Sequence, residues 1–302
     1  MKLVKIIILL IYIFVLGCTG CISNSSRPVV EDEIAVEAVT GPDYRNPGMI
    51  FYDSIEGKLT SSAGCEVAYT YFRPGKVSKD VMVILGHGFM RSKGRMIDLT
   101  RHLASWGISV VAVEFCNSKL WAGNHDLNGA DMVAVARKLN ADKVIYAGFS
   151  AGGLAALAAA GLDKNTIALF GLDMVDNKGL GKKIAPELTI PLYGLIAAPS
   201  ICNADNNGLE SYKAAFDSRV IEVEDATHCH FEFPFDGKCS IACGIGEKRF
   251  KREVIQKTIL GFTTAFVLWQ TGIAINGETW WSDGSKNINI MTEAGYIKTR
   301  IP

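Results

Sequence analysis

The chain has 302 residues, 49% of them apolar, and its 31 Lys and Arg residues balance 31 Asp and Glu residues. This length suits one large domain or two small ones, and the apolar content is sufficient for a substantial core. There is no net charge and no basic run interleaved with aromatic residues. We therefore expect no nucleic-acid partner.

The N-terminus has the pattern of an export signal. Lys2 and Lys5 precede an apolar run over residues 6–16, which is shorter than the roughly 20 residues that span a bilayer as a helix. The run ends in Val-Leu-Gly-Cys18, which resembles a bacterial lipobox, so we expect Cys18 to be lipidated; Cys21 is the second choice. The alternative is an ordinary signal peptide with an incidental cysteine. Residues 1–21 are thus predicted to be a signal and lipidation region, and the lipid would hold an exported protein at a membrane of the cell envelope.

The remainder divides into a tether and a domain. Residues 22–47, with several Ser, Pro and acidic residues, are predicted to be a flexible tether, and residues 48–302 a single domain. Eight cysteines in an exported chain indicate disulfides. Setting Cys18 aside leaves an odd number, so at least one thiol stays free or pairs between chains. Cys239 and Cys243 lack the paired C-x2-C spacing of a structural zinc site, and we predict no metal.

Hydrophobic patterning predicts strands that alternate with helices along the domain. Two early strands form an antiparallel hairpin, and the later ones are continuous apolar runs typical of buried parallel strands. This rhythm predicts an α/β fold with a mainly parallel central sheet of about eight strands and helices on both faces. The tail from residue 272 gives no clear signal. The predicted strands are 49–54, 66–73, 81–85, 108–114, 142–147, 166–172, 191–197 and 219–223, and the predicted helices are 95–106, 126–139, a helix after residue 152, and 250–269.

The motif G-x-S-x-G occurs at residues 148–152, with Ser150 at its centre. A β-prone run precedes it and an alanine-rich, helix-forming run follows it. Strand, sharp turn and helix is the context in which such a motif forms a nucleophile elbow. Gly148 and Gly152 flank the serine where a side chain would collide in so tight a turn. We therefore predict Ser150 to be a catalytic nucleophile, against an ordinary serine in a βα turn.

A serine hydroxyl needs a neighbouring base and an acid that orients the base. His228 follows the last predicted strand and is the predicted base, with His230 as the alternative. The acid should lie between the serine and the histidine in chain order. Asp173, directly after the strand 166–172, is preferred; Asp205 is the second choice and Asp176 the third.

Residues 86–89, Gly-His-Gly-Phe, follow a buried strand and form a turn in which backbone N–H groups can approach a carbonyl oxygen. The N–H of Phe89, or of Met90, is a predicted oxyanion donor, and the N–H of Ala151 is the other. The side chain of His87 is expected to satisfy backbone groups and to transfer no proton.

Together these motifs resemble those of the α/β-hydrolase superfamily, and within it the chlorophyllase-like and cutinase-like polyesterase branch. Further points of resemblance are the L-D-x-V-D segment 172–176 and the P-S-x-C-N segment 199–203. The resemblance covers residues 80–270 and implies an α/β-hydrolase fold and a Ser-His-Asp carboxylester hydrolase with Ser150, His228 and Asp173. It also implies a disulfide from Cys202 to Cys229 or Cys239. The position of the acid is similar to that in chlorophyllases rather than in polyesterases.

The sequence thus predicts an exported serine esterase or lipase that needs no cofactor and acts on a small-molecule or lipid ester; protein partners remain open. The alternatives are an acyltransferase with the same triad and a non-catalytic binding lipoprotein. Phe149 and Trp121 are predicted apolar walls of the substrate site, and residues 174–188 a loop or small lid.

Overall fold

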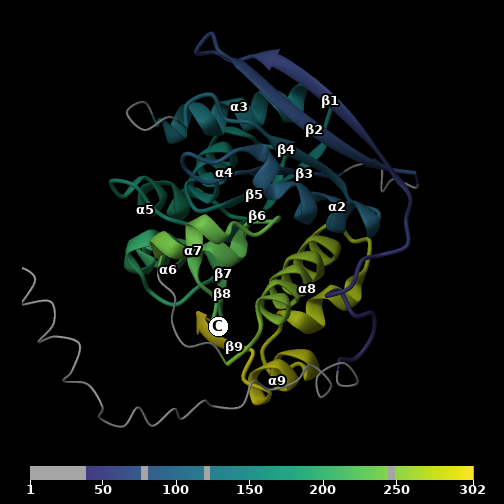
Figure 1. The fold of residues 1–302 in the computed structure, drawn as a ribbon. Coiled ribbons are helices and arrows are strands. Elements are labelled where there is room, and N and C mark those ends of the chain that lie inside the picture. The colour runs from purple at the N-terminus through teal and green to yellow at the C-terminus, as the bar shows by residue number, and fades with distance from the viewer. Residues whose placement is uncertain (1–38, 76–80, 119–122, 244–248, 302) are drawn as a thin grey trace, which may run out of the picture.

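Nine strands form one mixed sheet in the computed structural model, which describes residues 39–75, 81–118, 123–243 and 249–301 (Figure 1). The strand order is β1-β2-β4-β3-β5-β6-β7-β8-β9. Neighbours from β4 to β8 are parallel, whereas β1 with β2, β2 with β4 and β8 with β9 are antiparallel. The strands are β1 Tyr52–Thr60, β2 Glu66–Pro74, β3 Val81–Gly86, β4 Ser109–Val113, β5 Lys143–Phe149, β6 Thr166–Leu172, β7 Pro191–Ile196, β8 Asp217–Val223 and β9 Ile297–Ile301.

The α/β class is confirmed, and the strand count is one higher than predicted. All eight predicted strands are present, and β1 with β2 is the expected hairpin, although β1 begins three residues later and runs to Thr60. The ninth strand, β9, comes from the tail that gave no signal. Only Ile297 of its five residues is buried, so it lacks the hydrophobic alternation that marks a strand. It completes the sheet by pairing antiparallel with β8.

Helices cover both faces of the sheet, and each face has its own apolar core (Figure 1). One core joins the sheet to α3, α4, α5 and α6, and the other joins it to α2, α8 and α9. No helix in the described ranges is long and apolar enough to cross a bilayer. The helices are α2 Ile97–Ser105, α3 His125–Lys138, α4 Ala151–Leu162, α5 Leu180–Ile184, α6 Leu209–Ala214, α7 Gly237–Cys243, α8 Arg252–Gln270 and α9 Lys286–Glu293, with short 3-10 helices η2 Lys93–Met96, η3 Ala185–Glu187, η4 Ile201–Asn206, η5 His228–Phe231 and η6 Ile275–Trp280.

The tail from residue 272 supplies two large core residues. Trp280 and Trp281 are both buried, and their rings lie 5.3 and 5.5 Å from the ring of Phe262 in α8. The indole N–H of Trp281 donates to the carbonyl of Phe262 at 3.0 Å, which satisfies a polar group that burial would otherwise leave unpaired. The tail therefore fixes the long helix α8 against the sheet.

The predicted signal, lipidation and tether residues 1–38, including Cys18, lie outside the described residues. The last part of the predicted tether packs on the domain. Tyr44 is fully buried, and the side chain of Asn287 in α9 accepts from the N–H of Thr40 at 2.7 Å. The body of the protein thus includes residues from 39 onward.

Candidate active site

Ser150 stands at the sharp turn between β5 and α4. Its backbone has φ 55° and ψ −123°, a strained conformation that the surrounding contacts must hold. Its N–H donates to the carbonyl of Leu172 at 2.9 Å, and its own carbonyl accepts from Gly153 at 3.0 Å. A Cβ at Gly148 would lie 2.2 Å from the carbonyl oxygen of Gly152, which explains the flanking glycine. The strand-turn-helix context that the motif predicted is present.

His228 and Asp173 lie in line with Ser150. The Nε2 atom of His228 is 3.0 Å from Ser150 Oγ, and its Nδ1 atom is 2.6 Å from Asp173 Oδ2. All three residues are buried, and Asp173 has none of its surface exposed. The carboxylate accepts a hydrogen bond from the Nδ1–H group, so Nε2 presents its lone pair to the serine hydroxyl. Three residues predicted separately from sequence are therefore brought together in one hydrogen-bonded chain.

Asn203 is a site residue that the sequence reasoning missed. Its Nδ2 atom lies 3.4 and 3.3 Å from the two carboxylate oxygens of Asp173, and the N–H of Ala197 donates to Asp173 Oδ1 at 2.9 Å. These donors stabilise the ionised carboxylate and fix its orientation toward His228. The available signal was the asparagine of the segment 199–203, which lies in the loop after β7, beside the end of β6.

The alternative triad members lie elsewhere. His230 uses Nδ1 to accept from the N–H of Thr227 at 2.9 Å, so it closes the turn of η5. Asp176 accepts from the N–H groups of Gly181 and Lys182, at 2.9 and 3.2 Å, and thereby caps the first turn of α5. Asp205 is exposed in η4, with φ 52°.

The oxyanion donors predicted from sequence border the serine. A Cβ at Gly88 would lie 3.4 Å from Ser150 Cβ, which places the turn of residues 86–89 directly beside the nucleophile. The N–H of Met90 donates to the carbonyl of Ser118 at 3.2 Å, which leaves the N–H of Phe89 as the donor from this turn. Ala151 begins α4, so its N–H is one of those that have no partner within the helix.

His87 holds this turn in place. Its Nδ1 atom lies 2.8 Å from the carbonyl oxygen of Gly88, and its Nε2 atom accepts from the N–H of Phe115 at 3.0 Å. Both ring nitrogens therefore satisfy backbone groups, as predicted, and neither faces Ser150 Oγ in the triad.

The substrate-wall role predicted for Phe149 is corrected. Only 2% of its surface is exposed, and its ring lies 4.6 Å from the ring of His228. Its side chain belongs to the apolar core and packs beside the imidazole of His228. Trp121 lies outside the described residues. The exposed apolar side chains beside the serine are those of Phe89 and Met90.

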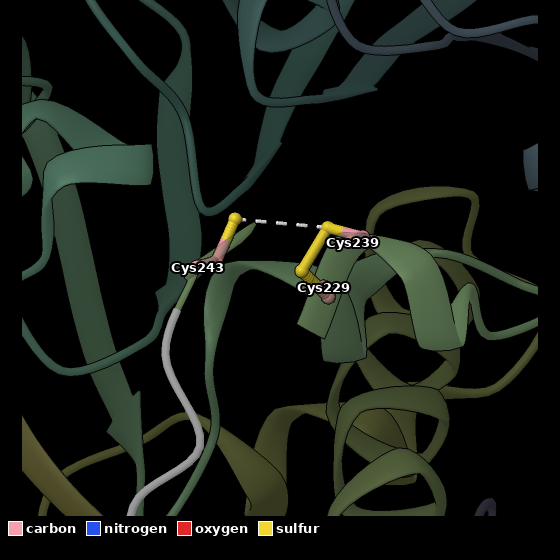
Figure 2. A group of neighbouring side chains, drawn as sticks. All are labelled: Cys229, Cys239 and Cys243. Carbon is pink, nitrogen blue, oxygen red and sulfur yellow. Dashed lines mark hydrogen bonds between the residues drawn. A yellow bond between two sulfur atoms is a disulfide. The ribbon is translucent and has the colours of Figure 1, made fainter. Parts of the chain in front are cut away.

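Two disulfides hold the segment that carries His228. Cys229 pairs with Cys239 (Figure 2), and Cys243 at the end of α7 pairs with Cys202 in η4. The pairing expected for Cys202, with Cys229 or Cys239, is therefore wrong; four cysteines close in space allow several pairings, and spacing cannot choose among them. A third disulfide joins Cys65 to Cys116.

The sulfurs of Cys239 and Cys243 lie 3.8 Å apart, a contact that Figure 2 marks with a dashed line. Together with the Cys229 sulfur they form a group compact enough to surround a metal ion. Each sulfur is already bonded in a disulfide, however, and metal binding by cysteine requires a thiolate. The arrangement therefore serves to brace the loop.

Charged side chains connect residues 228–236, called the histidine loop here, with residues 86–95, called the oxyanion turn after its predicted role. Arg91 Nε lies 2.8 Å from Glu232 Oε1, and both Arg91 and Arg95 approach Asp236 Oδ2, at 3.3 and 3.1 Å. Glu232 is fully buried, and burial raises the pKa of its carboxyl while the nearby arginines oppose that shift. The N–H of Phe233 also donates to the carbonyl of Arg95. The two loops that carry the predicted base and the predicted oxyanion donor are thus one connected unit.

No known protein-family model matches the chain, and no curated protein matches it.

Proposed function

We propose that this protein is an exported serine carboxylester hydrolase that works through an acyl-enzyme. The observation that carries the proposal is the hydrogen-bonded chain from Ser150 through His228 to Asp173, with contacts of 3.0 and 2.6 Å, at a strained turn between a strand and a helix. A buried Ser-His-Asp chain with this geometry is the arrangement that activates a serine hydroxyl.

The reaction follows from the positions of these atoms. Ser150 Oγ attacks the ester carbonyl carbon while His228 Nε2 takes the hydroxyl proton, and Asp173 stabilises the imidazolium that forms. The N–H groups of Phe89 and Ala151 donate to the oxyanion; losing one such donor typically costs about 3 kcal/mol of transition-state stabilisation. His228 then protonates the leaving alcohol, and water, deprotonated by the same nitrogen, releases the acid.

We further propose that the fold is that of the α/β-hydrolases. The serine lies between β5 and α4, one oxyanion donor lies between β3 and α2, and the triad occurs in the chain order Ser, Asp, His. Each of these features is shared with that superfamily. The proposed acid, Asp173, directly follows β6, which lies beside β5 in the sheet. The segment after β7 contributes the N–H of Ala197, which donates to the Asp173 carboxylate.

Export and lipid anchoring through Cys18 form part of the same proposal. Three disulfides among the described residues favour an oxidising compartment. Metabolic labelling with a radioactive fatty acid tests the anchor. The wild-type chain should carry label, and the Cys18→Ser chain should carry none. Equal labelling of the two chains would exclude this cysteine, and Cys21→Ser would be the next variant.

The catalytic proposal is tested with the full chain and p-nitrophenyl esters from acetate to palmitate. We expect turnover by the wild type, reaction of Ser150 with a fluorophosphonate probe, and loss of both in Ser150→Ala. Ser54→Ala is the matched control, since this exposed serine lies in β1, at the edge of the sheet away from the triad. A folded wild type that neither turns over these esters nor reacts with the probe would favour the non-catalytic alternative, and ester products formed with an added alcohol would favour an acyltransferase.

A further inference from the structure

A cavity of about 330 Å³ lies between the start of α3 and the segment that leads into α5. One wall is formed by residues 123–126 and the other by residues 177–180 and Lys183. Helices that follow parallel strands begin at the carboxyl edge of the sheet. Ser150 lies at this edge, because it directly follows β5. Since α3, α4 and α5 lie on the same face (Figure 1), the cavity lies at the same edge as the nucleophile.

Two of its lining residues contact the oxyanion donors. Gly123 packs against the ring of Phe89, because a Cβ at this glycine would lie 3.1 Å from a ring carbon. The imidazole of His125 lies against the backbone of Ala151, the residue that carries the other predicted donor. An ester whose carbonyl oxygen occupies the oxyanion site would therefore have this cavity beside it. Since no lining residue belongs to the triad, the cavity would hold a substituent of the substrate and take no part in the reaction.

The charged groups at the cavity are predominantly cationic. Lys178 and Lys183 both line it, and within the described ranges neither has a carboxylate partner in ion-pair distance. The adjacent Lys182, in contrast, points to Glu210 at 3.4 Å. Asp126 is the one acidic residue of the described lining. Burial lowers the pKa of His125, and the charges of Asp126 and Asp176 oppose that shift.

We infer that this cavity is a subsite for a carboxylate carried by the ester substrate. Two lysines against one aspartate leave the described lining with a net positive charge, while the nearby Asp176 carboxylate accepts from the N–H groups of Gly181 and Lys182. The amide of Asn177 adds a hydrogen-bond donor. The first turn of the 14-residue helix α3 forms one wall, and the positive end of its dipole favours the same sign of ligand charge. The inference rests on the proposed hydrolase function and specifies its substrate class.

Paired esters that differ only in charge test the inference with the full chain. On the acyl side we would compare p-nitrophenyl hydrogen glutarate with its methyl ester. On the alcohol side we would compare 3-acetoxybenzoate with its methyl ester. Each kcat/KM is divided by the rate of alkaline hydrolysis of the same compound. We expect the anionic member of one pair to be favoured about 2- to 30-fold, as two exposed ion pairs would produce.

The variants separate the subsite from general charge effects. Lys178→Gln combined with Lys183→Gln should bring the ratio close to one and leave the neutral ester unchanged, whereas Lys182→Gln should keep the wild-type ratio. Asp126→Asn should raise the ratio, since it removes the opposing charge. The preference should also weaken in 0.5 M salt, where the Debye length is about 4 Å.

An active wild type without preference in either pair, or a preference that survives in the double variant, overturns the subsite and leaves the hydrolase proposal intact. A folded wild type that neither reacts with the probe at Ser150 nor turns over the neutral esters overturns the hydrolase proposal instead. In that case, calorimetric titration with glutarate decides on the subsite. Binding by the wild type and its loss in the double variant supports the subsite, and absence of binding to the wild type overturns it.

Discussion

Ser150 and Asp173 share an unusual backbone feature. Both have positive φ, 55° and 45°, and both stand directly after neighbouring parallel strands. Residues other than glycine adopt this conformation at a cost of about 1–3 kcal/mol, so the surrounding contacts must impose it. The result is that the two side chains project from the sheet edge toward the same imidazole.

Replacing Asp173 by Asn tests its role as the acid of the triad. The amide keeps the shape of the side chain but presents no negative charge to Nδ1 of His228, so the imidazole loses its tautomeric preference. We expect kcat for a p-nitrophenyl ester to fall by about 10³- to 10⁴-fold, with a small change in KM. Asp205→Asn and Asp176→Asn are the controls and should retain most of the activity. Equal loss in one of these controls would contradict the assignment.

Asp131 is a buried carboxyl in α3 that takes no part in the proposed reaction. Only 1% of its surface is exposed, and its carboxylate lies beside the Cys65–Cys116 disulfide. Burial raises its pKa to about 6, although hydrogen bonds from Ser61 and Asn117 act in the opposite direction. The folded protein therefore binds this proton more tightly than the unfolded chain does.

The pH dependence of stability follows from this difference. Between the unfolded pKa, about 4, and the folded pKa, about 6, the free energy of unfolding should decrease as pH rises, and the loss is complete above pH 6. Asp131→Asn should remove this slope and raise the free energy of unfolding at pH 7 by about 1–3 kcal/mol. Urea denaturation at pH 4, 5 and 7 measures the effect. Parallel pH profiles for the variant and the wild type would show that the pKa of Asp131 is the same in the folded protein and in the unfolded chain.

At the scale of elements, the histidine loop and the oxyanion turn depend on each other. Arg91 is the ion-pair partner of the fully buried Glu232. Arg91→Met leaves that carboxylate without its nearest cation. Breaking a buried pair typically costs about 3–5 kcal/mol, and since Arg95 stays nearby we expect a loss of about 2–3 kcal/mol together with a lower kcat.

The double variant Arg91→Met with Glu232→Gln distinguishes an ion pair from simple packing. Removing both charges avoids an unpaired buried carboxylate, so the double variant should be more stable than Arg91→Met alone. Denaturation of the two single variants and the double variant completes the cycle. Additive losses would mean that the two side chains do not interact.

The same elements show what the sequence can and cannot predict. The elbow and the eight strands follow from local signals: flanking glycines, apolar runs and a helix-forming segment after Ser150. The disulfide partner of Cys202 depends on how the loops pack, which no local pattern encodes. Strand β9 has one buried residue, and Trp280 lies in a short 3-10 helix, so neither carries a periodic signal. Asn203 acts across the sheet edge on a residue 30 positions earlier.

For the whole molecule, the C-terminal strand closes one edge of the sheet that carries the site. Strand β9 pairs with β8, and β8 ends five residues before His228. Two cations of β9 also pair with carboxylates at the end of β8. Arg300 lies 2.9 Å from Glu222, and Lys298 pairs with Glu224, which directly follows the strand. Burial raises the pKa of Glu222, and these two cations act against that shift.

Deleting residues 297–302 should therefore weaken the sheet and the site together. The deletion removes the ladder to β8, exposes its edge and leaves Glu222 without its cations. We expect Tm to fall by about 5 °C or more, and kcat to decrease because the segment from Val223 to His228 loses support. Deletion of Pro302 alone is the control and should leave both unchanged. Unaltered Tm and kcat in the longer deletion would mean that β8 and the histidine loop hold their position without the ninth strand, through other contacts such as the disulfides and the Arg91–Glu232 pair.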